Sequence, residues 1–352
     1  EKELDPLLYH SFYYMEKPAP ASAKYLSIDR LASQAKLYAQ EKPVHSLLIP
    51  ASPSSWQNVL FQTEGKRLER VLLAINPYTG QLEKKIPGNR HLFTLAEDVH
   101  RELLMGETGK TITGICCLSY LTILISGLIL WWPKNQKILR QRLKIKWDAK
   151  FKRLNWDLHA VGGFYTLPIL FIIAFTGLTW SYKWFNDSIF YLFDGKGPQK
   201  PAKFYHFSES SSPQGGPLQQ AYSQAQQLLP YASDVTITLP SKESNIVSVS
   251  KEQPQAAVSN VVDRLLFSAQ SGKLVKKELY ESQSRGMKVR RLVSPIHTGS
   301  IYGLPTKILV FLSCLIGGSM PITGFIIWLK RKKKTKKITT KPKISSKQPV
   351  LQ

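Results

Sequence analysis

The chain has 352 residues, with 48 Lys and Arg against 24 Asp and Glu, and a formal net charge of +24 at pH 7. Such a basic excess is typical of nucleic-acid binders, but here it is concentrated in two short blocks. Residues 133–158 carry a net +7 and residues 330–352 a net +10, so the rest of the chain has an ordinary charge. This distribution argues against a nucleic-acid partner and is typical of the flanks of membrane spans.

Two similar stretches are predicted to fold as small α+β modules. Residues 27–40 form a predicted helix, and residues 70–85 form a strand, an Asn-Pro-Tyr-Thr-Gly turn and a second strand. The same design recurs with a helix at 217–229 and a hairpin with a Ser-Gly turn at 260–276. Glycine after polar turn residues supplies the positive φ that tight hairpins need.

Three apolar runs are predicted to cross a membrane. Residues 109–132, 160–182 and 308–329 contain no charge except Lys110. Each has 22 to 24 residues, and about 20 residues of helix cross a hydrocarbon core. Tryptophans cluster at the ends of the runs, as is typical of membrane interfaces: Trp131, Trp132, Trp180, Trp184 and Trp328.

The basic blocks predict the orientation of these spans. The positive-inside rule puts the two basic blocks in the cytoplasm, so the two modules are expected on the outer side of the membrane. The N-terminus then lies outside too, and an upstream segment is expected: a cleaved signal peptide or, as we favour, a first transmembrane helix. The predicted organisation is an outer module at 1–98, a span at 99–132, a cytoplasmic loop at 133–158, a span at 159–184, an outer module at 185–296, a span at 297–329 and a cytoplasmic tail at 330–352.

Three histidines share one context. His100, His159 and His297 each lie shortly before a span, and each span carries a Ser-Gly or Thr-Gly pair near its far end. Alternating topology puts His100 and His297 at the outer boundary and His159 at the inner one. Two imidazoles at one depth on neighbouring helices are what bis-histidine haem ligation requires. The alternative is that these histidines only face lipid headgroups, but the shared context favours haem. Small residues behind the histidines would let a porphyrin approach: Gly106, Gly109, Gly162, Gly163, Gly299 and Gly303.

Other polar residues have weaker patterns. Lys288, Arg290 and Arg291 precede His297 and could hold haem propionates or an anionic chelate, or simply face lipid phosphates. Four histidines show no metal-ligand spacing and are predicted to be surface residues, with His91 nine residues before His100: His10, His45, His91 and His206. No nucleotide-binding or nucleophile motif is present.

The chain resembles the PepSY-associated transmembrane family, which includes iron-regulated inner-membrane proteins and ferric-siderophore reductases. Three motifs carry the resemblance, in order: LAEDVHRELLMGETG leading into SGLILWWP, RLNWDLHAVGGFYTLP leading into FTGLTW, and SPIHTGSIYGLPTK leading into PITGFIIWLKRKKK. The hairpins at 75–82 and 263–274 resemble the PepSY module. Ser126 stands where the family usually has threonine.

The resemblance implies a membrane α-helical bundle, with three spans present and four expected, and two PepSY-like modules on the periplasmic side of a bacterial inner membrane. It implies two b-type haems, with His100 and His297 as one iron-ligand pair and His159 as one ligand of the other. The second ligand of that inner haem is expected on the missing first helix, so the inner haem is incomplete without it. The expected function is electron transfer to a ferric siderophore or other Fe(III) chelate, with a cytosolic or quinol donor. The alternative is a non-redox, membrane-anchored protein that binds peptides or regulates a periplasmic peptidase.

Overall fold

The computed structural model describes residues 4–16, 23–40, 42–51, 57–198, 216–241 and 244–339. The chain divides into two compact units. The first comprises Glu1–Cys116 and Gly177–Ile296, and it contains a β-sheet with its covering helices. The second comprises Cys117–Thr176 and His297–Gln352, and it contains most of the long apolar helices.

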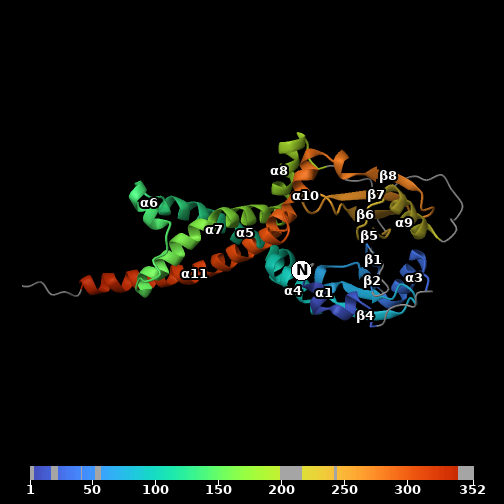
Figure 1. The fold of residues 1–352 in the computed structure, drawn as a ribbon, viewed down its shortest axis with the longest axis horizontal. Helices are drawn as coiled ribbons and strands as arrows, with labels where there is room; N and C mark the ends of the chain where they lie inside the picture. The colour runs from blue at the N-terminus through green and yellow to red at the C-terminus, as the bar shows by residue number, and fades with distance from the viewer. Residues whose placement is uncertain are drawn as a thin grey trace, which may run out of the picture. The chain divides into compact units, whose positions relative to one another are not determined.

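Eight antiparallel strands form one sheet in the first unit (Figure 1), in the order β4-β3-β2-β1-β5-β6-β7-β8. The first module consists of α3 (Ile28–Ala39), β1 (Val44–Ile49), β2 (Val59–Thr63), β3 (Val71–Ile75) and β4 (Leu82–Pro87). The second module consists of α9 (Pro217–Leu228), β5 (Val235–Thr238), β6 (Ile246–Glu252), β7 (Val262–Ser268) and β8 (Leu274–Glu278). The predicted helix and hairpin are therefore present in each module. The two modules were predicted as separate units, whereas β1 pairs with β5 and joins them into one sheet.

Alternate strand residues build the core of this sheet because successive side chains point to opposite faces. Leu47, Phe61 and Phe267 are almost fully buried and belong to one cluster with residues of α3 and α9. On other strand positions of the first module, Ala74 packs with Phe12 of α2 (His10–Tyr13), which follows α1 (Asp5–Leu8). The edge strands β4 and β8 each expose a Lys-Lys pair, which disfavours pairing with another chain.

The two modules cap each other's helices. The Asp29 carboxylate of α3 accepts hydrogen bonds from the backbone N–H groups of Leu218 (3.2 Å) and Gln219 (2.8 Å) at the start of α9. In return, the Gln219 side-chain oxygen accepts from the Ile28 N–H at the start of α3, at 3.0 Å. A helix N-terminus has unpaired N–H groups and a partial positive charge, so both contacts stabilise the junction.

We expect Asp29→Ala to weaken this junction. The substitution leaves two N–H groups of α9 without their acceptor, and loss of such a cap costs about 1–2 kcal/mol. The measurement is the free energy of unfolding of the detergent-solubilised chain in urea. Glu83→Ala is a suitable control because Glu83 is exposed and its bond to Asn76 stays within one hairpin. Equal stability of the Asp29 and Glu83 variants would contradict the assigned role.

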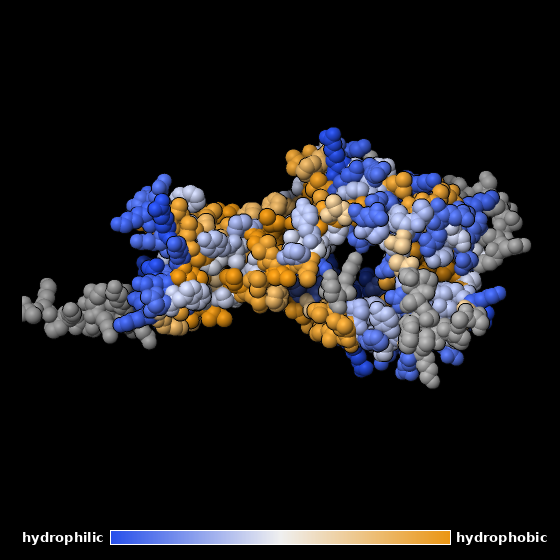
Figure 2. Space-filling model, viewed as in Figure 1, coloured by the Kyte–Doolittle hydropathy of each residue, from blue (hydrophilic) through white to orange (hydrophobic). Residues whose placement is uncertain are grey.

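Among the residues that the structure describes, three helices are long and apolar enough to cross a membrane, as predicted: α5 (Gly106–Trp131), α7 (Phe151–Ser181) and α11 (Leu304–Thr339). Hydrophobic residues cover their surface in Figure 2. The helix α7 begins well before its apolar run, so that His159 lies inside it. The remaining helices are α4 (Leu92–Glu102), α6 (Gln136–Arg142), α8 (Lys183–Asp194) and α10 (Arg285–Thr298), with short 3-10 turns η1 (Arg67–Glu69), η2 (Gly88–Arg90) and η3 (Tyr280–Ser282).

Small residues let the long helices approach closely in the second unit. A Cβ added to Gly162 of α7 would lie 3.3 Å from Ile316 of α11. One added to Gly317 of α11 would lie 3.0 Å from Leu170 of α7. Such contacts are typical of helices that pack inside lipid, where backbone proximity strengthens van der Waals attraction. The glycines at 162 and 163, expected beside a porphyrin, lie at this contact between α7 and α11.

Candidate functional site

His100 and His297 occupy equivalent local structures. Each lies near the end of a helix, α4 or α10, that stops a few residues before α5 or α11 begins. Gly106 follows His100 by six residues, and Gly303 follows His297 by six. The φ angles of these glycines are +57° and +72°, a left-handed conformation that glycine adopts without steric cost. Each histidine therefore lies just before a tight corner at which the chain turns from one helix into the next.

Two further glycines make these corners tight. A Cβ on Gly109 would lie 1.6 Å from the Glu102 carbonyl oxygen. A Cβ on Gly299 would lie 2.7 Å from the Thr306 carbonyl oxygen, and Gly299 has a φ of +72°. Both positions thus need glycine for the path of the backbone itself, a reason that differs from the predicted approach of a porphyrin.

The His297 ring is held by α7. Its Nδ1 lies 2.9 Å from the Ile173 carbonyl oxygen and 3.1 Å from the Thr176 hydroxyl. A carbonyl oxygen only accepts hydrogen bonds, so Nδ1 carries the hydrogen in the neutral ring. The lone pair then belongs to Nε2, the nitrogen that can bind a metal.

The His159 ring is held in the same manner by α11. Its Nδ1 lies 2.9 Å from the Thr323 hydroxyl. The Thr323 hydroxyl donates within its own helix, to the Ser319 or Met320 carbonyl at 3.1 Å. Its oxygen therefore accepts from Nδ1–H, again leaving the Nε2 lone pair. Asn155 donates to the Thr323 carbonyl at 3.1 Å and fixes this threonine further.

The threonines of the repeated Thr-Gly pairs position histidine rings, a role that was not predicted from the sequence. Thr176 and Thr323 each contact the Nδ1 of a histidine from another helix. A Cβ on Gly324 would lie 3.2 Å from the His159 ring, so the glycine of that pair gives the imidazole room. The recurrence of the pair near span ends was the available signal, but only the packing shows which histidine each threonine meets.

The helix α7 carries both arrangements. His159 lies 17 residues before Thr176, which binds His297. At 1.5 Å per residue the two sites are about 25 Å apart along the helix axis. This separation is comparable with the thickness of a hydrocarbon core, about 30 Å. The helix α7 thus positions, toward each of its ends, an imidazole whose Nε2 can bind a metal.

His100 is exposed on α4. It belongs to the first unit and His297 to the second, so their joint coordination of one iron stays a prediction. Within the described ranges, no group of three or more His, Cys, Asp or Glu side chains could hold a metal ion. His10 and His45 are exposed as predicted, and His206 lies outside the described residues.

His91 is not a surface residue, and the prediction that it is was wrong. Its ring is almost fully buried, with Nε2 3.0 Å from the Asp5 carboxylate. Tyr13 donates to the same carboxylate at 2.6 Å, and the Thr94 hydroxyl lies 3.0 Å from Nδ1. These contacts attach α1 and α2 to the start of α4. Asp5 is 86 residues away in the chain, so local sequence carried no sign of the partner.

The predicted basic residues near His297 are half-buried on α10. Arg290 donates from Nε to the Asn186 side chain, and its guanidinium lies 5.5 Å from the centre of the Trp180 ring. Arg291 donates from Nε to the Gln283 side chain at 2.7 Å. Burial lowers the pKa of both guanidiniums, but arginine stays charged at neutral pH. Both side chains are thereby positioned by neighbouring elements.

Lys288 is bound differently from the two arginines. Its ammonium donates to the Glu281 carbonyl at 2.8 Å and lies 5.6 Å from the centre of the Tyr280 ring. All three basic residues therefore have protein contacts of their own. Whether they also hold propionates or an anionic chelate stays a prediction.

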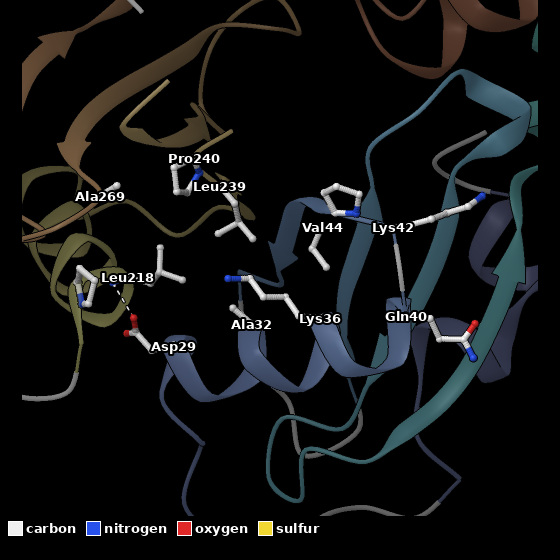
Figure 3. A pocket seen from close by; sticks show the side chains of 12 residues that line it. Asp29, Ala32, Lys36, Gln40, Lys42, Val44, Leu218, Leu239, Pro240 and Ala269 are labelled. Atoms are coloured by element: carbon white, nitrogen blue, oxygen red, sulfur yellow. Dashed lines mark hydrogen bonds between the residues drawn. The ribbon is translucent and has the colours of Figure 1, made fainter. Parts of the chain in front are cut away.

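A separate pocket of about 470 Å³ lies on the side of the sheet that α3 and α9 cover, between α3 and the start of α9. Figure 3 shows the Lys36 side chain extending from α3 into this space, with Asp29 directed to the Leu218 backbone. Lys42 lines the pocket and donates to the Glu69 carbonyl. The pocket thus combines cationic groups with a buried apolar lining that includes Ala32, Val44 and Leu239.

Comparison with known proteins gives one result that covers most of the chain. The family model described as "PepSY-associated TM region" matches residues 1–331. A search of curated proteins gives no match. The matched range includes both modules, the apolar helices and all three candidate histidines.

Proposed function

We propose that this chain, which belongs to the PepSY-associated transmembrane family, conducts electrons across a membrane through haem and reduces an Fe(III) chelate. In this proposal His100 and His297 would hold one haem iron, and His159 would help to hold a second. The membrane would be the inner membrane of a bacterium. The basic flanks of the spans favour a cytoplasmic location, so the first and second modules would face the periplasm.

One observation carries the proposal: His297 and His159 each donate Nδ1–H to a threonine or carbonyl on another helix. Histidines that bind metals almost always donate their other ring N–H to such a partner. The bond fixes the tautomer and the ring orientation, and it raises the basicity of Nε2. A histidine that merely faced lipid headgroups would have no need for this support.

Haem would supply the one-electron chemistry, and the chain would supply position, axial ligands and a low-dielectric surrounding. The helix α7 contributes to both proposed sites. Its Thr176 contacts the His297 ring, and it carries His159, which contacts Thr323. The electron donor would be a cytosolic reductase or a membrane quinol. An anionic ferric chelate would be attracted by basic residues such as Arg290 and Arg291.

The direct test is the optical spectrum of the purified full chain. Haem ligated by two histidines gives a Soret band and, after dithionite reduction, a sharp α-band. Protein expressed with haem precursor that shows neither band would refute the proposal. Stopped-flow oxidation of the reduced protein by a ferric siderophore then tests the acceptor, and a ferric chelate that leaves the reduced spectrum unchanged would argue against that part.

Thr176→Val and Thr323→Val are expected to weaken one haem site each. Valine has nearly the shape of threonine but accepts no hydrogen bond from Nδ1–H. Loss of such a supporting partner lowers metal affinity about 10- to 100-fold. Spectroelectrochemical titration should show one midpoint potential shifted in each variant and the other unchanged. Thr122→Val is the control, since the Thr122 hydroxyl bonds only its own helix at Leu118. Identical shifts in all three variants would contradict the assignment.

A second candidate function rests on the pocket between α3 and α9. Lys36 projects into a space with an apolar lining, which suits a carboxylate with an apolar tail, such as the C-terminus of a peptide. The two modules, joined in one sheet, would then bind peptides, and the long helices would anchor them in the membrane. This activity needs no haem and is compatible with its presence.

Calorimetric titration with short apolar peptides separates this candidate from the redox function. A free C-terminal carboxylate should bind more tightly than its amide, and Lys36→Glu should reverse the preference by replacing attraction with repulsion. Lys24→Glu is the control, an exposed lysine outside the pocket lining. Binding that is unaffected by amidation and by Lys36→Glu would refute the pocket as the site.

A further inference from the structure

We infer that α4 and α8 are interfacial elements, whose outward apolar stripes insert into the boundary between lipid headgroups and acyl chains. The stripe on α4 consists of Leu92, Ala96 and Val99, at the i, i+4 and i+7 positions of one helix face, and all three are exposed. Leu103, which ends the helix in the left-handed conformation, is exposed as well. The two residues that follow, Leu104 and Met105, are more than half exposed. Clusters of exposed apolar side chains of this kind mark an interaction surface.

The opposite face of α4 is polar and is the face that packs on the protein. Asp98 is 5% exposed and accepts a hydrogen bond from Arg67 of η1 at 3.2 Å. The same guanidinium lies within 4 Å of Glu97 and Glu102. A surface helix of a water-soluble domain buries its apolar stripe and exposes its charges. In α4 this arrangement is reversed, so water is not the medium that its outer face fits.

The helix α8 also carries exposed apolar side chains on its outward face. These are Trp184, Tyr191 and Leu192, which are 62% to 79% exposed. Figure 2 shows hydrophobic surface over this helix. Its inward face is mixed: Phe190 is buried, Asn186 binds Arg290, and the Asp194 carboxylate binds the Ser284 hydroxyl at 2.6 Å and the Gly286 N–H at 2.8 Å.

Continuity with the membrane spans identifies the partner of both stripes. Met105 directly precedes the first residue of α5, and Tyr182 alone separates α7 from α8. The beginning of α5 packs against the end of α7, since a Cβ on Gly114 would lie 2.9 Å from the Tyr182 hydroxyl. Both stripes therefore adjoin the same membrane boundary.

The residue types also fit that boundary. Tryptophan and tyrosine prefer the interface because their rings are apolar and their N–H and O–H groups still reach water. Amphipathic helices with leucine and aromatic residues on one face lie in this region with that face turned to the acyl chains. We therefore assign the lipid interface, rather than a second protein chain, as the occupant of both stripes.

Spin-label depth measurements on the full chain in lipid nanodiscs test this inference. Nitroxides are attached at Leu104→Cys and Leu192→Cys in a background where Cys116, Cys117 and Cys314 are replaced by alanine. Collision rates are measured with oxygen, which concentrates in lipid, and with a water-soluble nickel chelate. The ratio of oxygen to nickel collisions should be severalfold higher at both sites than at Gln81→Cys, an exposed position in the β3–β4 turn.

Two outcomes would overturn the inference. A ratio equal to that at Gln81→Cys means that the stripes face water, and low collision rates with both reagents mean that protein covers them. A second measurement needs no cysteine changes: brominated lipids should quench the fluorescence of the native chain more than that of Trp184→Phe. Equal quenching of the two proteins also counts against insertion of α8.

Discussion

In the proposed two-haem arrangement, His297→Ala is expected to remove one of the two haem signals from the purified protein and to leave the other intact. Alanine offers no Nε2 lone pair, and a six-coordinate haem that loses one axial ligand is lost or becomes five-coordinate. The His297 ring is held by Ile173 and Thr176 of α7, whereas the second site at His159 is about 25 Å further along that helix. Haem content per chain should therefore fall by about half.

The reciprocal variant makes this prediction specific. His159→Ala should remove the other signal, so that the two variants retain haems with different midpoint potentials. Retention of one haem in each variant also shows that the bundle still folds. His45→Ala, an exposed histidine on β1, should keep both. Full haem content in the His297 variant, or loss of both signals in both variants, would contradict the division into two sites.

Gly109→Ala is expected to have the largest effect on stability of any single methyl group added to α5. The new Cβ would lie 1.6 Å from the Glu102 carbonyl oxygen and 2.4 Å from its carbonyl carbon. Backbone atoms cannot move aside as a flexible side chain can, so the corner between α4 and α5 must open. Overpacking against backbone at a corner of this kind is expected to cost about 3 kcal/mol or more.

Gly127→Ala provides the matched control, because it lies in the same helix with nothing within 4 Å of the new Cβ. Alanine there should be neutral or slightly stabilising, since it favours helix over glycine. Thermal unfolding in detergent, followed by loss of the monodisperse peak in size-exclusion chromatography, measures both. Equal midpoints for the two variants would show that the corner tolerates a side chain.

Gly109→Ala also connects stability with the candidate site. His100 is on α4, two residues before Glu102, so opening the corner displaces its imidazole. If His100 is an iron ligand, the folded fraction of this variant should lose the same haem as His297→Ala. The proposed haem at His159 should remain, because the contact of the His159 ring with Thr323 does not involve α4.

Several features were predictable because they depend on residues close together in sequence. The long uncharged runs required membrane-spanning helices, and α5, α7 and α11 contain them. The turn sequences required hairpins, and β3–β4 and β7–β8 are present. The resemblance to the PepSY-associated transmembrane family is confirmed over residues 1–331. Each of these inferences rests on local hydropathy, turn chemistry or motif order.

Features that depend on distant residues were not predictable in the same way. The pairing of β1 with β5 is made by main-chain groups, which every residue carries, so no sequence pattern marked it. The burial of His91 depends on Asp5, far away in the chain. The reversal of α4 depends on Arg67, whose guanidinium draws the acidic face of the helix onto the first module.

The division is clearest at the histidines. By itself, the sequence determined that His100, His159 and His297 accompany membrane spans, and that each span carries a Ser-Gly or Thr-Gly pair near its far end. Only the tertiary structure decided that Thr176 meets His297 and Thr323 meets His159. The physical reason is that helix periodicity specifies which residues share a face of one helix. Which residue that face meets depends on how the helices pack.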